Sequence, residues 1–157
     1  MPRLVFLNVV ALFVLLIAPQ VSNAADSYGP LKGKVFGTGQ QFVVVFLHGD
    51  ISKGGGATYH EAIMRVVAAR AKHSSAIALL RPGYNDAQGL VSPGTNHNRR
   101  DQYTTENNDL VAQTLISIRA LYPGARLIVV GHSGGAAQLD AVIGRYPNIV
   151  DTAILLA

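Results

Sequence analysis

The fold is decided by one stretch of sequence, Ile128-Val-Val-Gly131-His132-Ser133-Gly134-Gly135-Ala136-Ala137. It places Gly-x-Ser-x-Gly directly between a short apolar run and a segment of helical periodicity. A turn from strand to helix this tight strains its central residue, so the residues two before and two after it must be small. Gly131 and Gly135 meet that requirement. The stretch predicts a buried strand, a sharp turn that holds the Ser133 hydroxyl above a sheet, and a helix.

Similar apolar runs occur on both sides of this turn. Residues 42–47, Phe-Val-Val-Val-Phe-Leu, are apolar throughout, as expected for a central strand that is buried on both faces. Further strands are predicted at residues 76–80, 126–130 and 150–156, with a weaker one at residues 31–36. Because these runs alternate with longer helical patterns, we expect mostly parallel strands joined by right-handed crossovers. The predicted fold class is α/β, a three-layer, doubly wound sheet.

Three helices are expected, at residues 59–72, 106–121 and 134–146. The first begins with the spacing of a capping box, because Glu61 follows Thr58 by three residues. Thr105 is the expected N-cap of the second helix. The second and third helices are expected to stop at Tyr122-Pro123-Gly124 and Pro147, and the apolar stripe of the second comprises Leu110, Leu115, Ile118 and Leu121.

Two connections stand out by composition. Residues 49–57 contain three consecutive glycines, Gly54 to Gly56, and residues 82–103 form a long segment rich in Gly, Asn and Asp. A loop that long in a compact domain usually covers a binding site or is mobile. In an open parallel sheet both loops emerge at the carboxyl ends of strands, where such folds bind ligands.

The composition of the 157 residues excludes several classes of function. Apolar residues make up 49% and charged residues 14%, which predicts a single packed domain. The absence of cysteine excludes disulfides, thiolate metal sites and a cysteine nucleophile. The formal charge of +4 is dispersed, so no nucleic-acid partner is expected. No metal site is expected either, because no His and carboxylate pair has ligand spacing on one helix face.

Residues 1–24 have the layout of a secretory signal peptide. A cation precedes an apolar run at residues 4–18, and Ser22 and Ala24 occupy the −3 and −1 positions of a cleavage site. The run is shorter than the ~20 residues that cross a bilayer as a helix, and an uncleaved anchor is the alternative. We expect an exported protein, periplasmic or extracellular, whose domain covers residues 25–157 without stable membrane association.

The turn at Ser133 carries the predicted chemistry. A serine held there is a nucleophile for acyl transfer, and the backbone N–H of Gly134, at a helix N-terminus, favours a developing anion. The second donor is expected to be the N–H of Asp50, after His48-Gly49, with Ile51 as the alternative. A phosphate-binding loop at the triple glycine ranks last, because the chain lacks both the Gly-Lys-Ser/Thr of a Walker loop and a dinucleotide fingerprint.

With these motifs in order, residues 31–157 resemble the α/β-hydrolase superfamily of serine hydrolases. The resemblance is carried by His48-Gly49-Asp50 after the third strand of that fold, Arg81-Pro82-Gly83-Tyr84 after the fourth, and the Ser133 turn after the fifth. The second motif and Gly-His-Ser-Gly-Gly-Ala are most similar to the branch of prolyl oligopeptidases and proline iminopeptidases. The resemblance implies a triad in the chain order Ser, acid, His.

The chain departs from this pattern because no histidine follows Ser133; the five histidines are His48, His60, His73, His97 and His132. We expect the first to support the oxyanion turn, the second and third to be solvated or capping residues, and the last to face sideways. His97, in the long loop, is the one that could swing toward the serine. Neither Asp140 nor Asp151 is placed as a triad acid.

This gap leads us to expect the N-terminal portion of a longer enzyme, with little turnover by itself and an open sheet edge at residues 150–156. The first functional hypothesis is an exported serine hydrolase of esterase or peptidase type. It would cleave an ester or amide of a small molecule or peptide through an acyl-enzyme on Ser133, with no cofactor. The second hypothesis is a non-catalytic protein of the same fold that binds a ligand or a partner.

Overall fold

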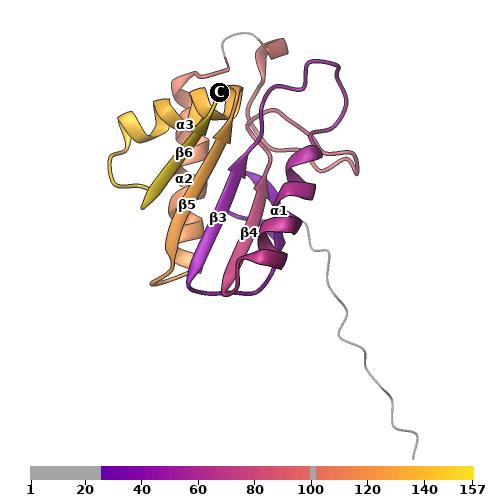
Figure 1. Cartoon of the computed structure of the whole chain (residues 1–157). Helices are drawn as coiled ribbons and strands as arrows, with labels where there is room; N and C mark the ends of the chain where they lie inside the picture. Colours follow the sequence, from indigo (N-terminus) through magenta and orange to yellow (C-terminus); the bar gives the residue numbers. More distant parts are fainter. Residues whose placement is uncertain (1–25, 100–101) are drawn as a thin grey trace, which may run out of the picture.

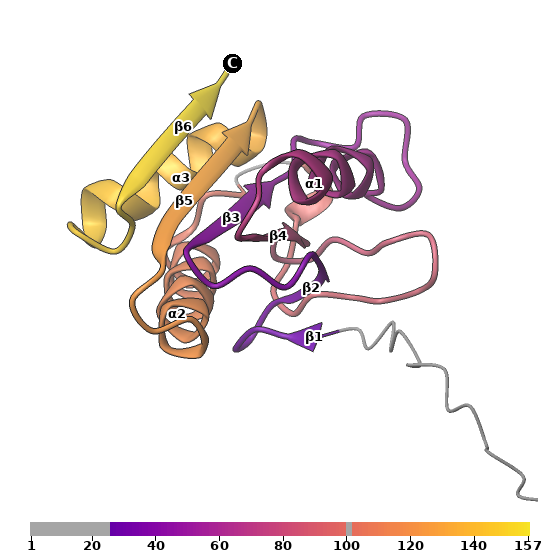
Figure 2. The same ribbon diagram turned by 60° about the horizontal axis from the view of Figure 1, so that its bottom comes forward.

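A six-stranded mixed sheet organises the computed structural model, which describes residues 26–99 and 102–157. The strands lie in the order β1-β2-β4-β3-β5-β6; Figure 1 shows the part from β4 to β6, and Figure 2 shows β1 and β2 as well. Their bounds are β1 Asp26–Ser27, β2 Lys32–Phe36, β3 Phe42–Leu47, β4 Ser74–Leu79, β5 Arg126–His132 and β6 Thr152–Leu156. The expected signal peptide, residues 1–24, lies outside the described residues.

The core of the sheet is parallel. β3 pairs in parallel with β4 and β5, and β5 does so with β6, whereas β2 is antiparallel to β4. The α/β fold class predicted from the alternating runs is therefore confirmed. The β2 strand departs from the parallel expectation because only residues 37–41 connect it to β3, and a parallel connection needs a crossover of about a dozen residues or more.

Helices cover both faces of this sheet (Figure 2). α1 (Tyr59–Arg70) packs on one face, and α2 (Thr105–Leu121) and α3 (Gly134–Arg145) pack on the other. A short 3-10 helix, η1 (His97–Arg99), lies in the long loop before α2. The three α-helices occupy the segments predicted for them. None of the helices in the described ranges has the length and apolar character needed to cross a bilayer.

Thr58 is the N-cap residue of α1, as predicted, but the capping box does not form, and the predicted N-cap of α2 is wrong by one residue. Thr58 precedes α1, but its side chain makes no capping hydrogen bond. The capping box does not form because the Glu61 carboxylate pairs instead with Lys34, at 2.8 Å. In α2 the cap is Thr104 rather than Thr105, and its hydroxyl accepts the backbone N–H three residues further on, at 3.3 Å.

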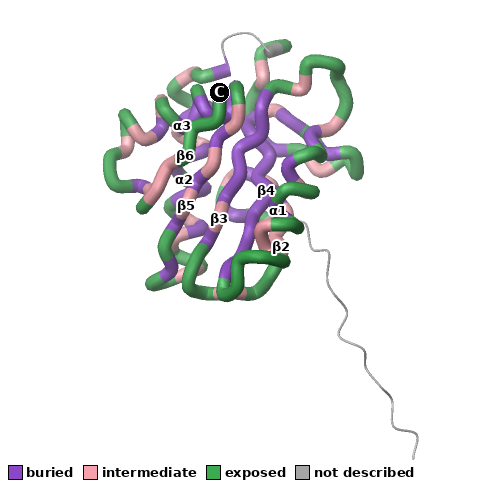
Figure 3. The backbone as a smooth tube through the Cα atoms, in the orientation of Figure 1, coloured by how far each residue is buried: buried purple, intermediate pink, exposed green. Residues whose placement is uncertain are grey.

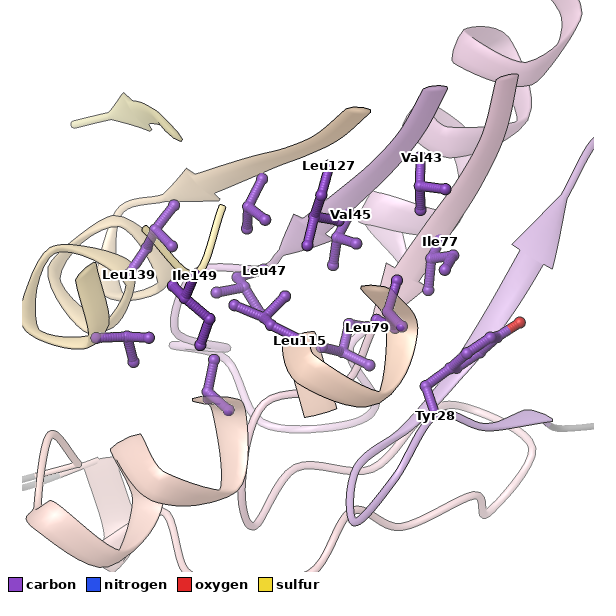
Figure 4. Close-up of a cluster of buried hydrophobic side chains, with 14 of the residues drawn as sticks. Tyr28, Val43, Val45, Leu47, Ile77, Leu79, Leu115, Leu127, Leu139 and Ile149 are labelled. Atoms are coloured by element: carbon purple, nitrogen blue, oxygen red, sulfur yellow. The ribbon is translucent and has the colours of Figure 1, made fainter. Parts of the chain in front are cut away.

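Two apolar clusters fill the spaces between the layers. The larger lies between the sheet and helices α2 and α3 (Figure 4), and the smaller lies under α1. On α2, Leu115 and Ile118 are fully buried as predicted, whereas Leu121 is 58% exposed because the helix ends there. The β3 and β4 strands are buried along most of their length, and exposed residues lie in the loops, on the outer faces of the helices and in β6 (Figure 3).

The β6 strand forms one edge of the sheet, as expected for residues 150–156. It pairs with β5 on one side, and no described strand lies on the other. Three apolar side chains of this strand, Ile154, Leu155 and Leu156, are each more than 40% exposed. Successive residues of a strand face opposite sides of the sheet, so β6 leaves apolar surface open on both faces.

The α3 helix approaches the end of β3 so closely that Gly135 has no room for a side chain. A Cβ on Gly135 would overlap the carbonyl oxygen of Leu47 and lie 2.6 Å from that of His48. A Cβ on Gly131 would lie 2.5 Å from the Gly135 carbonyl oxygen. The small residues that the Gly-x-Ser-x-Gly spacing predicts are therefore required by backbone contacts.

Replacing Gly135 with Ala should lower the free energy of unfolding by about 1–3 kcal/mol, because the methyl group overlaps backbone atoms. Gly144→Ala is the matched control on the same helix, since a Cβ there meets nothing within 4 Å. That substitution should stabilise the protein by about 0.5–1 kcal/mol. Urea unfolding measures both changes, and a shift of the same sign and size in the two variants would contradict the packing described.

Candidate active site

Ser133 occupies the turn between β5 and α3 in a backbone conformation that is rare for a residue with a side chain. Its φ is 50° and its ψ is −121°. The turn is held on both sides, because the Ser133 N–H donates to the Leu156 carbonyl at 2.7 Å and its own carbonyl accepts the Ala136 N–H at 2.8 Å. The side chain does not cap α3, and the residue is exposed. The hydroxyl is therefore fixed by strained backbone and accessible to solvent.

The turn after β3 lies directly against the Ser133 turn. A Cβ on Gly49 would lie 3.0 Å from the Ser133 Cβ, and a Cβ on Gly134 would overlap the Asp50 carboxylate. Within the described residues, neither the Asp50 N–H nor the Gly134 N–H donates to a backbone carbonyl. The structure thus brings Ser133, Gly134 and Asp50 together from two separate strand ends. Their catalytic assignment stays a prediction.

Arg81, which follows β4, connects these two turns from inside the protein. It is 1% exposed. Its Nη1 donates to the Asp50 carboxylate at 2.8 Å and to the His48 carbonyl at 3.2 Å. Its Nε donates to Gln138 of α3 at 2.9 Å, and its Nη2 donates to Gln102 at 3.2 Å. One guanidinium therefore ties the end of β3, the helix of the serine turn and the long loop to a single point.

The Asp50 carboxylate is the counter-ion of this guanidinium. Burial by itself would raise the pKa of Asp50, but the hydrogen bonds and charge of Arg81, together with the Tyr84 hydroxyl, hold it below its usual range. The Tyr84 hydroxyl lies 3.1 Å from the Asp50 carboxylate and 2.6 Å from Gln102. Burial raises the pKa of Tyr84 to about 12. The Asp50 carboxylate thus stays ionised. Its bonds to Arg81 and Tyr84 fix the turn after β3, and so they fix the position of the Asp50 backbone N–H.

The His48 ring supports the same turn from below. Its Nε2 accepts the Arg81 backbone N–H at 3.1 Å, and its Nδ1 lies 2.7 Å from the Gly49 carbonyl oxygen. These contacts place the ring proton on Nδ1, which donates to that carbonyl. Burial, with smaller contributions from the charges of His60 and Arg81, lowers the pKa of His48 to about 3. His48 is a neutral structural residue, as predicted.

His60 differs from its prediction as a solvated or capping residue. It is 1% exposed, its ring centroid lies 4.9 Å from that of His48, and neither ring nitrogen has a hydrogen-bond partner among the described residues. Burial, reinforced by the Lys34 charge, lowers the pKa of His60 to about 4. The prediction is wrong because His60 lies one turn before Met64 on the buried face of α1. That i, i+4 spacing was the available signal.

His132 is engaged with α1 through Tyr59, a residue that the sequence did not single out. The His132 Nδ1 lies 2.8 Å from the Tyr59 hydroxyl, which also accepts the Gly49 N–H at 2.5 Å. The two rings pack edge to face with their centroids 5.7 Å apart. Tyr59 therefore supports both turns, and it orients the imidazole beside the serine.

The other predicted partners of Ser133 lie elsewhere. His73 is exposed at the amino end of β4, and His97 is exposed in η1. Asp151 accepts the Leu127 N–H at 2.7 Å and pairs with Arg119, so it has a structural role. None of the five imidazoles hydrogen-bonds to the Ser133 hydroxyl. In the described ranges, no group of three or more His, Asp or Glu side chains could hold a metal ion.

The two loops singled out by their composition line an open hollow of about 520 Å³. Residues 51–55 line one side, and Tyr84, Asn85, Asn96 and Asn98 line the other. Ile51 directly follows Asp50 in sequence, and the Tyr84 hydroxyl contacts the Asp50 carboxylate. The hollow therefore adjoins the turn that supplies the second expected N–H donor.

The sheet order and the strained serine after a central parallel strand define a three-layer α/β protein with its site at the carboxyl ends of the strands. More particularly, the chain has part of the α/β-hydrolase fold, as the solved structures that it resembles show. No family model and no curated protein matches the sequence.

The likeness to these solved structures is at low sequence identity. An epoxide hydrolase variant from Vigna radiata is 22% identical, with a TM-score of 0.52, over 78% of this chain and 34% of that chain. A 2-hydroxy-6-oxo-6-phenylhexa-2,4-dienoate hydrolase from Rhodococcus is 18% identical, with a TM-score of 0.53, over 80% and 42% of the two chains. Another Vigna radiata epoxide hydrolase is 18% identical, with a TM-score of 0.53, over 81% and 35%. The chain spans between a third and about two fifths of the length of these proteins.

The two buried histidines should make stability fall as the pH drops from 7 to 5. An unfolded histidine has a pKa of about 6.5, so the unfolded chain binds protons that the folded chain excludes until about pH 4 for His60 and about pH 3 for His48. Above pH 6.5 both histidines are neutral in the folded and the unfolded chain, so they do not lower the free energy of unfolding. By pH 5 each histidine has lowered it by about 2 kcal/mol, because only the unfolded chain is protonated there.

His60→Phe should reduce this pH dependence by about half, because the replacement cannot be protonated. His73→Asn, at an exposed site, is the control and should leave the slope unchanged. Urea unfolding at several pH values between 5 and 7 measures the slope. An unaltered slope in His60→Phe would show that His60 is accessible to protons in the folded state.

Removing the guanidinium with Arg81→Met should destabilise the protein by about 3–5 kcal/mol, since it leaves the His48 carbonyl and the Gln138 side-chain oxygen without a donor, and leaves Asp50 and Gln102 with Tyr84 alone. Asp50→Asn should cost less, about 2 kcal/mol, because the buried guanidinium loses its counter-ion but the new amide oxygen can still accept its hydrogen bond. Chemical unfolding of both variants tests this order. Equal losses would mean that Arg81 contributes only through its pair with Asp50.

Proposed function

We propose that the protein is a serine hydrolase that cleaves an ester or an amide through an acyl-enzyme on Ser133. The observation that carries this proposal is the strained, exposed Ser133 turn packed against the turn after β3. Two backbone N–H groups, of Gly134 and Asp50, stand on these facing turns without a backbone acceptor among the described residues. Such an arrangement supports an oxyanion hole.

In the proposed reaction, the Ser133 Oγ bonds to the carbonyl carbon of the substrate while its proton passes to a histidine base. The carbonyl oxygen becomes an oxyanion that accepts the N–H groups of Gly134 and Asp50. The base then gives the proton to the leaving alcohol or amine as its bond to carbon breaks. Water, deprotonated by the same base, releases the acyl group from the serine.

The base itself is not among the five histidines in their described positions. His48 and His60 are buried, and His132 is bound to Tyr59. His73 lies at the amino end of β4, and His97, in η1, makes no hydrogen bond to Ser133. We propose that the histidine and its acid come from polypeptide outside these residues. The low share of each solved neighbour that this chain covers supports that proposal. The chain by itself should then acylate slowly.

The finer placement rests on sequence motifs. The Arg81-Pro82-Gly83-Tyr84 turn and the residues around Ser133 support an esterase or peptidase related to prolyl oligopeptidases and proline iminopeptidases. The layout of residues 1–24 supports export to the periplasm or the medium, with residues 25–157 as the mature domain. The substrate in this proposal is a small molecule or a peptide.

A non-catalytic ligand-binding protein is the second candidate. It is favoured by one observation, the lack of any described imidazole on the Ser133 hydroxyl. In that case the strained turn would serve only as architecture, and the hollow beside it would be the functional site.

A fluorophosphonate probe separates the two candidates. A nucleophilic Ser133 should be labelled covalently, with the adduct located by mass spectrometry, and Ser133→Ala should abolish the labelling. Ser117→Ala, a change at a serine on the far side of the sheet from α1, should label like the unmodified chain. Labelling that survives Ser133→Ala would refute the assignment, and its absence from a longer form that supplies the base would favour the binding protein.

A further inference from the structure

The hollow between the two loops is polar. Of the lining residues that the structure describes, Ile51 is the only aliphatic one, and Lys53 is the only one with a formal charge. The remaining side chains are a serine, a tyrosine and three asparagines. A ligand that enters this space therefore meets hydrogen-bonding groups and a cation rather than an apolar wall.

The two carboxylates nearest to the hollow in sequence are already neutralised by other cations. Asp50, two residues before Ser52, pairs with Arg81 at 2.8 Å. Asp86, beside Asn85, pairs with Lys34 at 2.7 Å. The pKa values of both carboxyls are held below their usual range, despite burial, by hydrogen bonds to these cations. Neither acid is left to balance a charge in the hollow.

Lys53 itself forms no ion pair within the described ranges. On the opposite wall, the Asn98 side-chain amide also has no hydrogen bond to a described residue, whereas the Asn96 amide is fixed by the Gly83 carbonyl at 3.1 Å and by the Asn98 N–H at 3.1 Å. An uncompensated ammonium and an unused amide thus face one space from two loops. An anionic group of a ligand can pair with the Lys53 ammonium and accept a hydrogen bond from the Asn98 amide.

We propose that this hollow binds a carboxylate, and that the natural substrate is an ester or amide whose acyl part ends in a carboxylate. Lys53 pairs with that group while the scissile carbonyl lies toward Asp50. The claim that the hollow binds a carboxylate does not depend on catalysis. The claim about the natural substrate rests on the proposed hydrolase function. A compact monocarboxylate suits the site better than a phosphate, because Lys53 is the only cation among the lining residues that the structure describes.

Binding to the Ser133→Ala protein tests the site without any hydrolysis. Monomethyl succinate carries the carboxylate, methyl butyrate is a neutral ester of similar size, and inorganic phosphate is the competing anion. Titration followed by nuclear magnetic resonance should give an affinity for monomethyl succinate about fivefold higher than for methyl butyrate, as expected for one partly exposed ion pair. The preference should shrink as salt is added.

Lys53→Gln should abolish the preference between the two esters, and Lys72→Gln, a change at an exposed lysine beyond the end of α1, should preserve it. Equal affinities in the parent protein, an unaltered preference in Lys53→Gln, or tighter binding of phosphate than of the carboxylate would each overturn the inference. Fluorophosphonate labelling of Ser133 in a longer form that supplies the histidine base reports separately on the hydrolase. Carboxylate preference without labelling of that form retains the binding site and rejects the enzyme, whereas labelling without preference supports the enzyme and rejects the carboxylate site.

Discussion

A single buried guanidinium holds the site of this protein together. Removing a charge from water is costly, and a group such as Arg81 is tolerated inside only when every side of it is hydrogen-bonded. Here the acceptors come from three different parts of the chain: Asp50 and the His48 carbonyl in the turn after β3, Gln102 in the long loop and Gln138 in α3. The guanidinium is planar and rigid, and all of these acceptors bind to it. The turn after β3 and α3 therefore cannot separate without breaking its hydrogen bonds.

Around Arg81, backbone segments pack so tightly that a side chain would not fit between them. Gly135 packs against carbonyl oxygens at the end of β3. Ser133 adopts a positive φ that costs about 1–3 kcal/mol. Such strain persists only where the surroundings over-determine it. The parallel sheet, the tight packing of α3 and the Tyr59 hydroxyl beneath Gly49 supply those constraints together. The exposed position of the Ser133 hydroxyl therefore depends on contacts made throughout the central sheet.

Much of this architecture could be predicted from local patterns. Uninterrupted apolar runs located β3 and β5, and the Gly-x-Ser-x-Gly spacing placed the turn, because both depend on residues close together in sequence. The interactions that were missed are long-range. The pairing of Glu61 with Lys34 displaced the capping box, and the burial of His60 depended on which face of α1 meets the sheet. The convergence of Arg81 on Gln102 and Gln138 joins residues that no sequence period connects.

The hydrogen bond from the Ser133 N–H to the Leu156 carbonyl couples the serine turn to β6, which lies at the edge of the sheet formed by the described residues. Edge strands undergo local opening more readily than central ones, since one side of their backbone has no protein partner. Each opening of β6 would break this anchor and give the strained serine a wider range of conformations. The time for which Ser133 keeps its strained backbone conformation therefore depends on how often β6 separates from β5. Amide hydrogen exchange along β6 would measure that opening directly.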